Sequence, residues 1–197
     1  MKKELFIISV ALLLTGCAQV RQNEESAPDW RTAYSAILLD FANSSDNTDA
    51  AFSLLDINGD DIPELFVSQG TGRVERCFVY TFSDESVPLG ELGEYGYIGF
   101  DTAIDQLVAT DAVQGHDWRG YYELRGDSLE FVQGFYNNYG AAAGTDEVEF
   151  HINGENVTEE EYMTAVAEYS GHEVLWLGRD NELTAETASA VAKGEYN

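Results

Sequence analysis

One short segment of the chain carries oxygen-bearing groups at nearly every second position. The segment from Asp56 to Glu64 reads DINGDDIPE, and Gly59 lets it bend at low steric cost. Ca²⁺ in proteins is held by about six to eight oxygen atoms at roughly 2.3–2.6 Å, so alternate groups of a tight loop can converge on it. The sequence therefore predicts a structural calcium site. Its predicted ligands are Asp56, Asn58, Asp60, the backbone carbonyl of Ile62, and Glu64.

The same residues also fit an ordinary turn between two strands. In such a turn the Asp and Asn side chains accept hydrogen bonds from their own backbone. Both alternatives require strands on either side, and the apolar residues of 51–56 and 62–68 predict them.

The segment resembles two families of calcium-binding loop. In the EF-hand and dockerin loop a carboxylate stands at position 12, where this chain has Val67. The hairpin of FG-GAP and integrin-like repeats, D-x-[DN]-G-D-G-x-x-D-L, is the closer match. Glu64 stands where that pattern has Asp, and Asp61 replaces its second Gly, a position that often has positive φ. The residues that match as they stand are Asp56, Asn58, Gly59, Asp60 and Leu65.

Two longer stretches resemble segments that are common in bacterial surface lipoproteins. They are 52–65, which follows an amino-terminal helix in those proteins, and 152–162, which reads as a strand, an Asn-Gly turn and a capped helix. This resemblance implies a family of surface lipoproteins with a single calcium-loop motif, and it implies no activity.

The amino terminus has the three parts of a lipoprotein leader. Lys2 and Lys3 are followed by the apolar run 5–14, which is too short to cross a bilayer because a spanning helix needs about 20 apolar residues. The tetrapeptide LTGC at 14–17 resembles the bacterial lipobox. The resemblance implies cleavage after residue 16 and a lipid on Cys17. We therefore expect a signal peptide at 1–16, a lipidated polar tether at 17–28, and one domain at 29–197 on the extracytoplasmic side of the cell membrane or outer membrane.

The charge of the chain restricts its partners. Ten Lys and Arg face 36 Asp and Glu, a formal net charge of −26. Such a surface repels nucleic acid and anionic lipid headgroups, so we expect no nucleic-acid partner and contact with the membrane through the anchor alone. With Cys17 used by the lipid, Cys77 has no disulfide partner, and its apolar surroundings predict a buried thiol.

The hydrophobic pattern predicts an α+β fold. Helical spacing of apolar residues predicts a helix from Trp30 to Phe41. An antiparallel meander follows, with two-residue hairpin turns predicted at 126–127 and 153–154. Thr158 and Glu161 form a capping-box pattern that begins a helix near 158–169. A last strand and a short terminal helix complete the chain. The predicted strands after residue 68 are 73–82, 95–100, 106–110, 120–125, 128–136, 148–152 and 173–177, and the terminal helix is 184–193.

No set of side chains in the sequence singles out a catalytic centre. His116, His151 and His172 are widely separated, and carboxylates are too frequent for any pair to stand out. Aromatic residues and Asn cluster at 95–97, 121–122 and 135–139, where they either form the core of a sheet or bind a glycan or protein ligand. We expect a lipid-anchored binding or structural protein rather than an enzyme. The alternative is a lipid-anchored hydrolase of cell-wall or dietary polymers that uses acidic residues.

Overall fold

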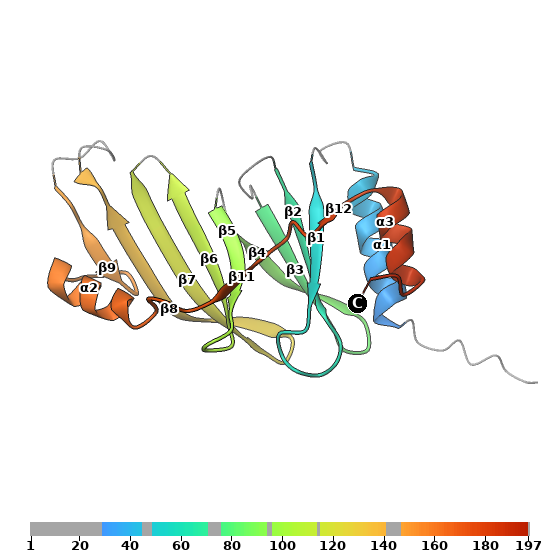
Figure 1. Ribbon diagram of the computed structural model, residues 1–197, viewed down its shortest axis with the longest axis horizontal. Coiled ribbons are helices and arrows are strands. Elements are labelled where there is room, and N and C mark those ends of the chain that lie inside the picture. The colour runs from blue at the N-terminus through green and yellow to red at the C-terminus, as the bar shows by residue number, and fades with distance from the viewer. Residues whose placement is uncertain are drawn as a thin grey trace, which may run out of the picture.

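The protein folds into four layers, helix–sheet–sheet–helix (Figure 1). The computed structural model describes residues 29–44, 49–70, 76–93, 96–113, 115–140 and 147–196. The predicted signal peptide, Cys17 and the tether lie outside these residues. The predicted α+β class is confirmed, with every strand pair antiparallel. Within the described ranges, no helix is both long and apolar enough to cross a membrane.

The first two layers are a pair of helices and a five-stranded sheet. The helices α1 (Trp30–Ala42) and α3 (Ala185–Ala192) cover one face of this sheet. Tyr34, Leu38 and Val191 of the helices are fully buried against Phe52 and Leu65 of the strands. The strand order is β12 (Asn181–Glu182), β1 (Ala51–Leu55), β2 (Glu64–Gln69), β3 (Arg76–Phe82) and β4 (Ser86–Leu92).

The other face of this sheet packs on a seven-stranded sheet. Successive side chains of a strand point to opposite faces, so Leu65 contacts the helices while Phe66 lies between the sheets. Cys77 is fully buried there as predicted, and burial raises the pKa of its thiol to about 12. The second sheet has the order β10 (Glu155–Asn156), β9 (Phe150–Ile152), β8 (Ser128–Asn138), β7 (His116–Arg125), β6 (Gln106–Val113), β5 (Gly96–Asp101) and β11 (Val174–Leu177).

The helix α2 (Glu159–Ala167) forms the fourth layer, on the outer face of the seven-stranded sheet. The predicted capping box is present: the Glu161 amide donates to Thr158 Oγ1 at 3.3 Å, and the Thr158 amide donates to Glu161 Oε2 at 2.9 Å. None of the α2 residues is buried, yet its apolar side packs on Tyr121 and Phe135. The helix therefore covers only part of the sheet.

Both predicted two-residue hairpin turns are confirmed. Gly126 follows β7 with φ of 57°, and Asn153 and Gly154 join β9 to β10 with φ of 54° and 82°. Strands β4, β10 and β12 were not predicted, because the last two have only two residues each and β4 contains Pro88 and Gly90. Pro is tolerated in β4 because this is an edge strand.

Candidate functional site

The predicted calcium loop forms the connection between β1 and β2, and its Asp side chains accept hydrogen bonds from the loop's own backbone. Asp56 Oδ1 accepts a hydrogen bond from the Gly59 amide at 2.7 Å, and Asp56 Oδ2 accepts one from the Asp61 amide at 3.0 Å. Asp60 Oδ1 accepts from the Ile62 amide at 2.8 Å. The loop thus has the self-capping bonds of an ordinary Asp-rich turn, whatever else it binds.

Asn58 links the two ends of this loop. Its Oδ1 accepts from the Asp60 amide at 3.0 Å, and its Nδ2 donates to Asp60 Oδ2 at 3.0 Å and to Glu64 Oε1 at 3.3 Å. In the described part of the chain, no group of three or more His, Cys, Asp or Glu side chains is arranged to hold a metal ion. Because Asn side chains and backbone carbonyls also supply oxygen ligands to Ca²⁺, the calcium site stays a prediction.

Asp61 adopts the positive φ that its position in the loop pattern suggested. Its φ is 67° and that of Gly59 is 77°. An L-residue other than Gly, Asn or Asp is strongly disfavoured in this conformation. The backbone of the loop therefore has the expected shape, with Asp in place of Gly at the second bend.

Glu64 differs from the other predicted ligands because it is buried. Its exposed fraction is 1%, Oε2 accepts from the Ile57 amide at 3.0 Å, and Oε1 accepts from Thr81 Oγ1 at 3.0 Å. Burial raises the pKa of this carboxyl to about 7, and the hydrogen bonds from Ile57 and Thr81 oppose that rise. Glu64 therefore joins the loop to β3 and titrates near neutral pH.

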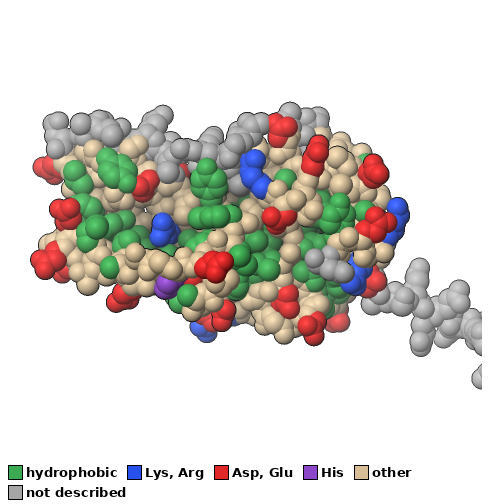
Figure 2. Space-filling view, in the orientation of Figure 1, with side chains coloured by type: hydrophobic (Ala, Val, Ile, Leu, Met, Phe, Trp, Pro, Cys, Tyr) green, Lys and Arg blue, Asp and Glu red, His purple; other side chains and the backbone are tan. Residues whose placement is uncertain are grey.

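A groove of about 690 Å³ lies between α2 and the outer face of the seven-stranded sheet. We call it the α2 groove. Its apolar lining comes from both the strands and the helix. Figure 2 shows hydrophobic side chains exposed over the half of the molecule that holds α2, on the left of the view. The main apolar lining residues are Tyr139, Phe150, Tyr162, Met163 and Trp176, and the main charged or amide ones are Asp117, Arg119, Asn137 and Glu159.

Hydrogen bonds hold the polar floor of the α2 groove in place. Asp117 on β7 and Asn137 on β8 are directly opposite in the strand register. Asp117 accepts a hydrogen bond from the Tyr139 hydroxyl, and this bond raises the pKa of Tyr139. Asn137 Oδ1 accepts from the Tyr162 hydroxyl of α2 at 3.1 Å. The floor is thus attached to two of the aromatic residues that line the groove.

An exposed aromatic ring forms one end of the α2 groove. Trp176 on β11 is 54% exposed, and Tyr97 on β5 packs beside it with ring centroids 5.8 Å apart. Gly99 is the strand partner of Trp176, and a Cβ there would lie 3.1 Å from Trp176 Cε3 and 2.4 Å from Val174 Cγ1. The absence of a side chain at Gly99 therefore lets the indole lie close to the sheet.

The buried Asp101 holds His172, which lies between α2 and β11. Asp101 on β5 is fully buried, and His172 Nδ1 lies 2.8 Å from Asp101 Oδ2. The amide and hydroxyl of Thr102 both donate to the Glu173 carbonyl at 3.2 Å. These contacts fix residues 172–173, which connect α2 to β11.

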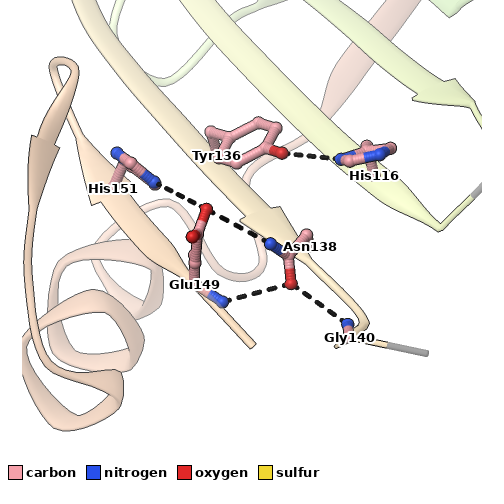
Figure 3. A network of polar contacts seen from close by, with 6 residues as sticks. All are labelled: His116, Tyr136, Asn138, Gly140, Glu149 and His151. Carbon is pink, nitrogen blue, oxygen red and sulfur yellow. Dashed lines mark hydrogen bonds and ion pairs between the residues drawn. The ribbon is translucent and has the colours of Figure 1, made fainter. Parts of the chain in front are cut away.

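A second polar network lies at the ends of β7, β8 and β9 (Figure 3). Tyr136 Oη is 2.6 Å from His116 Nδ1, and the Tyr136 ring contacts the His151 ring edge to face at 5.1 Å. His151 Nε2 lies 3.6 Å from Glu149 Oε2, which accepts from Asn138 Nδ2 at 3.3 Å. His116 and His151, which are far apart in sequence, therefore both contact Tyr136. These contacts join the ends of β7, β8 and β9.

No protein-family model, curated protein or solved structure matches the chain. The resemblances of the leader and of the Asp-rich loop therefore remain predictions from short segments.

Sequence reasoning identified part of the α2 groove. Asn137 and Tyr139 belong to the aromatic and amide-rich segment 135–139, and Tyr97, which packs against the lining residue Trp176, belongs to the segment 95–97. Trp176 and Met163 were missed because neither belongs to an aromatic and amide-rich segment of the sequence. Only the packing of α2 and β11 on the sheet brings them to the same groove.

The raised pKa of Glu64 predicts a pH-dependent stability. The folded pKa of about 7 exceeds the ordinary value of 4.5, so the folded state holds the proton between these values. The contribution of Glu64 is therefore complete below pH 4.5 and is lost as the pH rises through 7. We expect this group alone to lower the free energy of unfolding by roughly 2–3 kcal/mol between pH 5 and pH 8.

The Glu64→Gln variant is the control, because Gln keeps the shape of the neutral acid and does not titrate. Urea unfolding in calcium-free buffer should show the variant gaining stability relative to the wild type as the pH rises. A difference between the two proteins that is the same at pH 5 and pH 8 would show that Glu64 has no raised pKa.

Proposed function

We propose that this protein is a non-enzymatic, lipid-anchored extracytoplasmic binding module whose ligand occupies the α2 groove. The observation that carries the proposal is the lining of this groove, where exposed Trp176, Met163 and Tyr139 surround a polar floor. Apolar pockets with a few fixed polar groups are the usual form of ligand sites. Side chains of this size left exposed on a soluble domain indicate a binding surface.

The hydrolase alternative receives less support. Hydrolysis by a carboxyl pair requires an acid of raised pKa facing a second carboxylate in a cleft. Glu64 is the acid with a clearly raised pKa, but it lies in the β1–β2 hairpin, which contributes no residue to the groove. Within the groove, Asp117 already accepts the Tyr139 hydroxyl bond.

The membrane attachment is part of the same proposal. It is supported by the leader sequence and by the start of α1 at Trp30, which leaves residues 17–28 as a tether of about a dozen residues. A tether of this kind would keep the acidic domain away from anionic headgroups while the lipid holds the protein at the membrane.

The anchor is tested by changing Cys17 to Ser in the full chain. Without the thiol no diacylglyceryl group can be attached, so the variant should stay an uncleaved precursor and move to the aqueous phase in detergent partitioning. Cys77→Ser, which changes the other thiol of the chain, is the matched control. If Cys17→Ser partitions with the detergent as the wild type does, the protein is not anchored through this residue.

The ligand site is tested by truncating the ring at the end of the groove. We expect binding of residues 18–197 to glycan and peptide arrays to depend on Trp176, and Trp176→Ala to weaken the positive spots by about ten-fold or more. Leu175→Ala is the matched control, because Leu175 is 41% exposed on the same strand but does not line the groove. Binding that both variants retain would argue against this site.

We further propose that the loop 56–64 binds one Ca²⁺ that stabilises the β1–β2 hairpin. The support is the position of Asp56, Asn58 and Asp60 on one loop, next to Glu64. Each carboxylate oxygen has two lone pairs, so the hydrogen bonds to amides leave room for a cation. A cation would also favour the ionised form of Glu64 and lower its pKa.

Calcium should raise the melting temperature of residues 18–197, because an ion that binds only the folded state adds stability by mass action. We expect a rise of several degrees in millimolar calcium relative to EGTA, with magnesium having less effect. The double variant Asp56→Ala, Asp60→Ala should lose the rise, while Asp117→Ala should keep it. A rise that persists in the double variant would place the ion elsewhere.

A further inference from the structure

The charged residues of the α2 groove have different accessibility. Glu159 is exposed and is the first of three consecutive glutamates in the first turn of α2. Asp117 lies on the floor with the Tyr139 hydroxyl as its partner. Arg119 is the groove's described basic residue; it is exposed on β7, and its side chain hydrogen-bonds with Tyr121. The lining therefore places the carboxylates of Asp111, Asp117 and Glu159 against one guanidinium, so the charged groups of the groove are mainly acidic.

The net charge of the whole molecule is also negative. The formal net charge is −26, and Figure 2 shows acidic side chains spread over the visible face with few basic ones. Arg179 is close to the far side of Trp176, but its guanidinium donates to the Gly70 carbonyl at 2.6 Å. A surface of this kind attracts cations and slows the approach of anions.

The aromatic end of the groove fits a cation as well. Trp176 exposes its indole, and Tyr97 and Gly99 hold the ring against the sheet. A Lys ammonium or Arg guanidinium within about 6 Å of an aromatic ring is attracted by the ring's quadrupole, most strongly by Trp. On the opposite wall, Met163 is 57% exposed and offers a flexible apolar side chain for the methylene stem of such a residue.

We propose that the ligand of the α2 groove is a cationic peptide segment whose Lys or Arg side chains lie between Trp176 and the carboxylates of Asp117 and Glu159. This inference rests on the proposed function of the groove and adds the chemical class of the ligand. Apolar stems pack on Met163 and the aromatic lining, and the charged heads reach Asp117 and Glu159. Neutral glycans and acidic peptides lack the cationic group that this arrangement selects.

The test uses three probes of residues 18–197: capped pentalysine, its fully ε-acetylated analogue, and the neutral sugar cellopentaose. Acetylation removes the charge and keeps the stem. Isothermal titration calorimetry should detect pentalysine at low salt, with binding at least ten-fold weaker for the acetylated peptide. Because the interaction is electrostatic, affinity for pentalysine should fall steeply as sodium chloride rises from 0.05 to 0.5 M, by about ten-fold or more.

Single substitutions locate the binding. Glu159→Gln and Asp117→Asn should each weaken pentalysine binding about two- to five-fold, and Trp176→Ala should weaken it about ten-fold. Glu160→Gln is the matched control, because it removes the same charge from the next residue of α2, which does not line the groove. Its affinity should equal that of the wild type.

Each contrary outcome has a distinct meaning. If pentalysine binds equally to the wild type, Glu159→Gln, Asp117→Asn and Trp176→Ala, the peptide is held by the general surface charge and the inference is wrong. If cellopentaose binds in a Trp176-dependent manner and pentalysine does not, the groove is a binding site but its ligand is a glycan. If none of the three probes binds, the cationic inference is overturned, and the arrays decide whether the groove binds any ligand.

Discussion

The packing between the two sheets is the constraint on which the other features depend. Phe66, Cys77 and Val79 of the five-stranded sheet are buried against Ile98 and Leu107 of the seven-stranded sheet. Burial of apolar surface of this kind is the main favourable contribution to folding. Because the inner faces of the two sheets pack on each other, other elements must shield the outer face of each sheet from water. These elements are α1 and α3 on one side and the shorter α2 on the other. The α2 groove exists because this last cover is incomplete.

Few contacts hold α2 in position on the outer face of the seven-stranded sheet. The capping box at Thr158 begins α2, the Tyr162 hydroxyl attaches it to Asn137, and the contact of His172 with buried Asp101 fixes its connection to β11. The helix itself has no buried residue, so these polar contacts contribute more to its placement than they would for a core helix. The groove thus lies between a partly exposed helix and a continuous antiparallel sheet.

The two regions of chemical interest lie in different layers and depend on charge in different ways. Glu64 is buried beside Asp60 and Asp56, and burial, with a smaller contribution from these two charges, raises its pKa to about 7. The groove carboxylates belong to the opposite layers: Glu159 is exposed on α2, and Asp117 is half-buried with the Tyr139 hydroxyl as its partner. Where water is excluded, a carboxyl of this acidic chain titrates near neutral pH. Where water is present, the carboxylates produce an electrostatic field that attracts cations.

Local patterns in the sequence determined the fold class, the first helix, the capping box at Thr158, both two-residue turns and the shape of the Asp-rich loop. These features depend on side chains only a few residues apart, so their physical causes are visible in a short window. The very short strands and the Pro-containing edge strand β4 were missed because their pairing partners, rather than their own residues, make them strands. The assembly of the α2 groove was decided by the tertiary structure. Trp176, Met163 and Asp117 are far apart in the chain, and only the strand register and the placement of α2 bring their side chains to one surface.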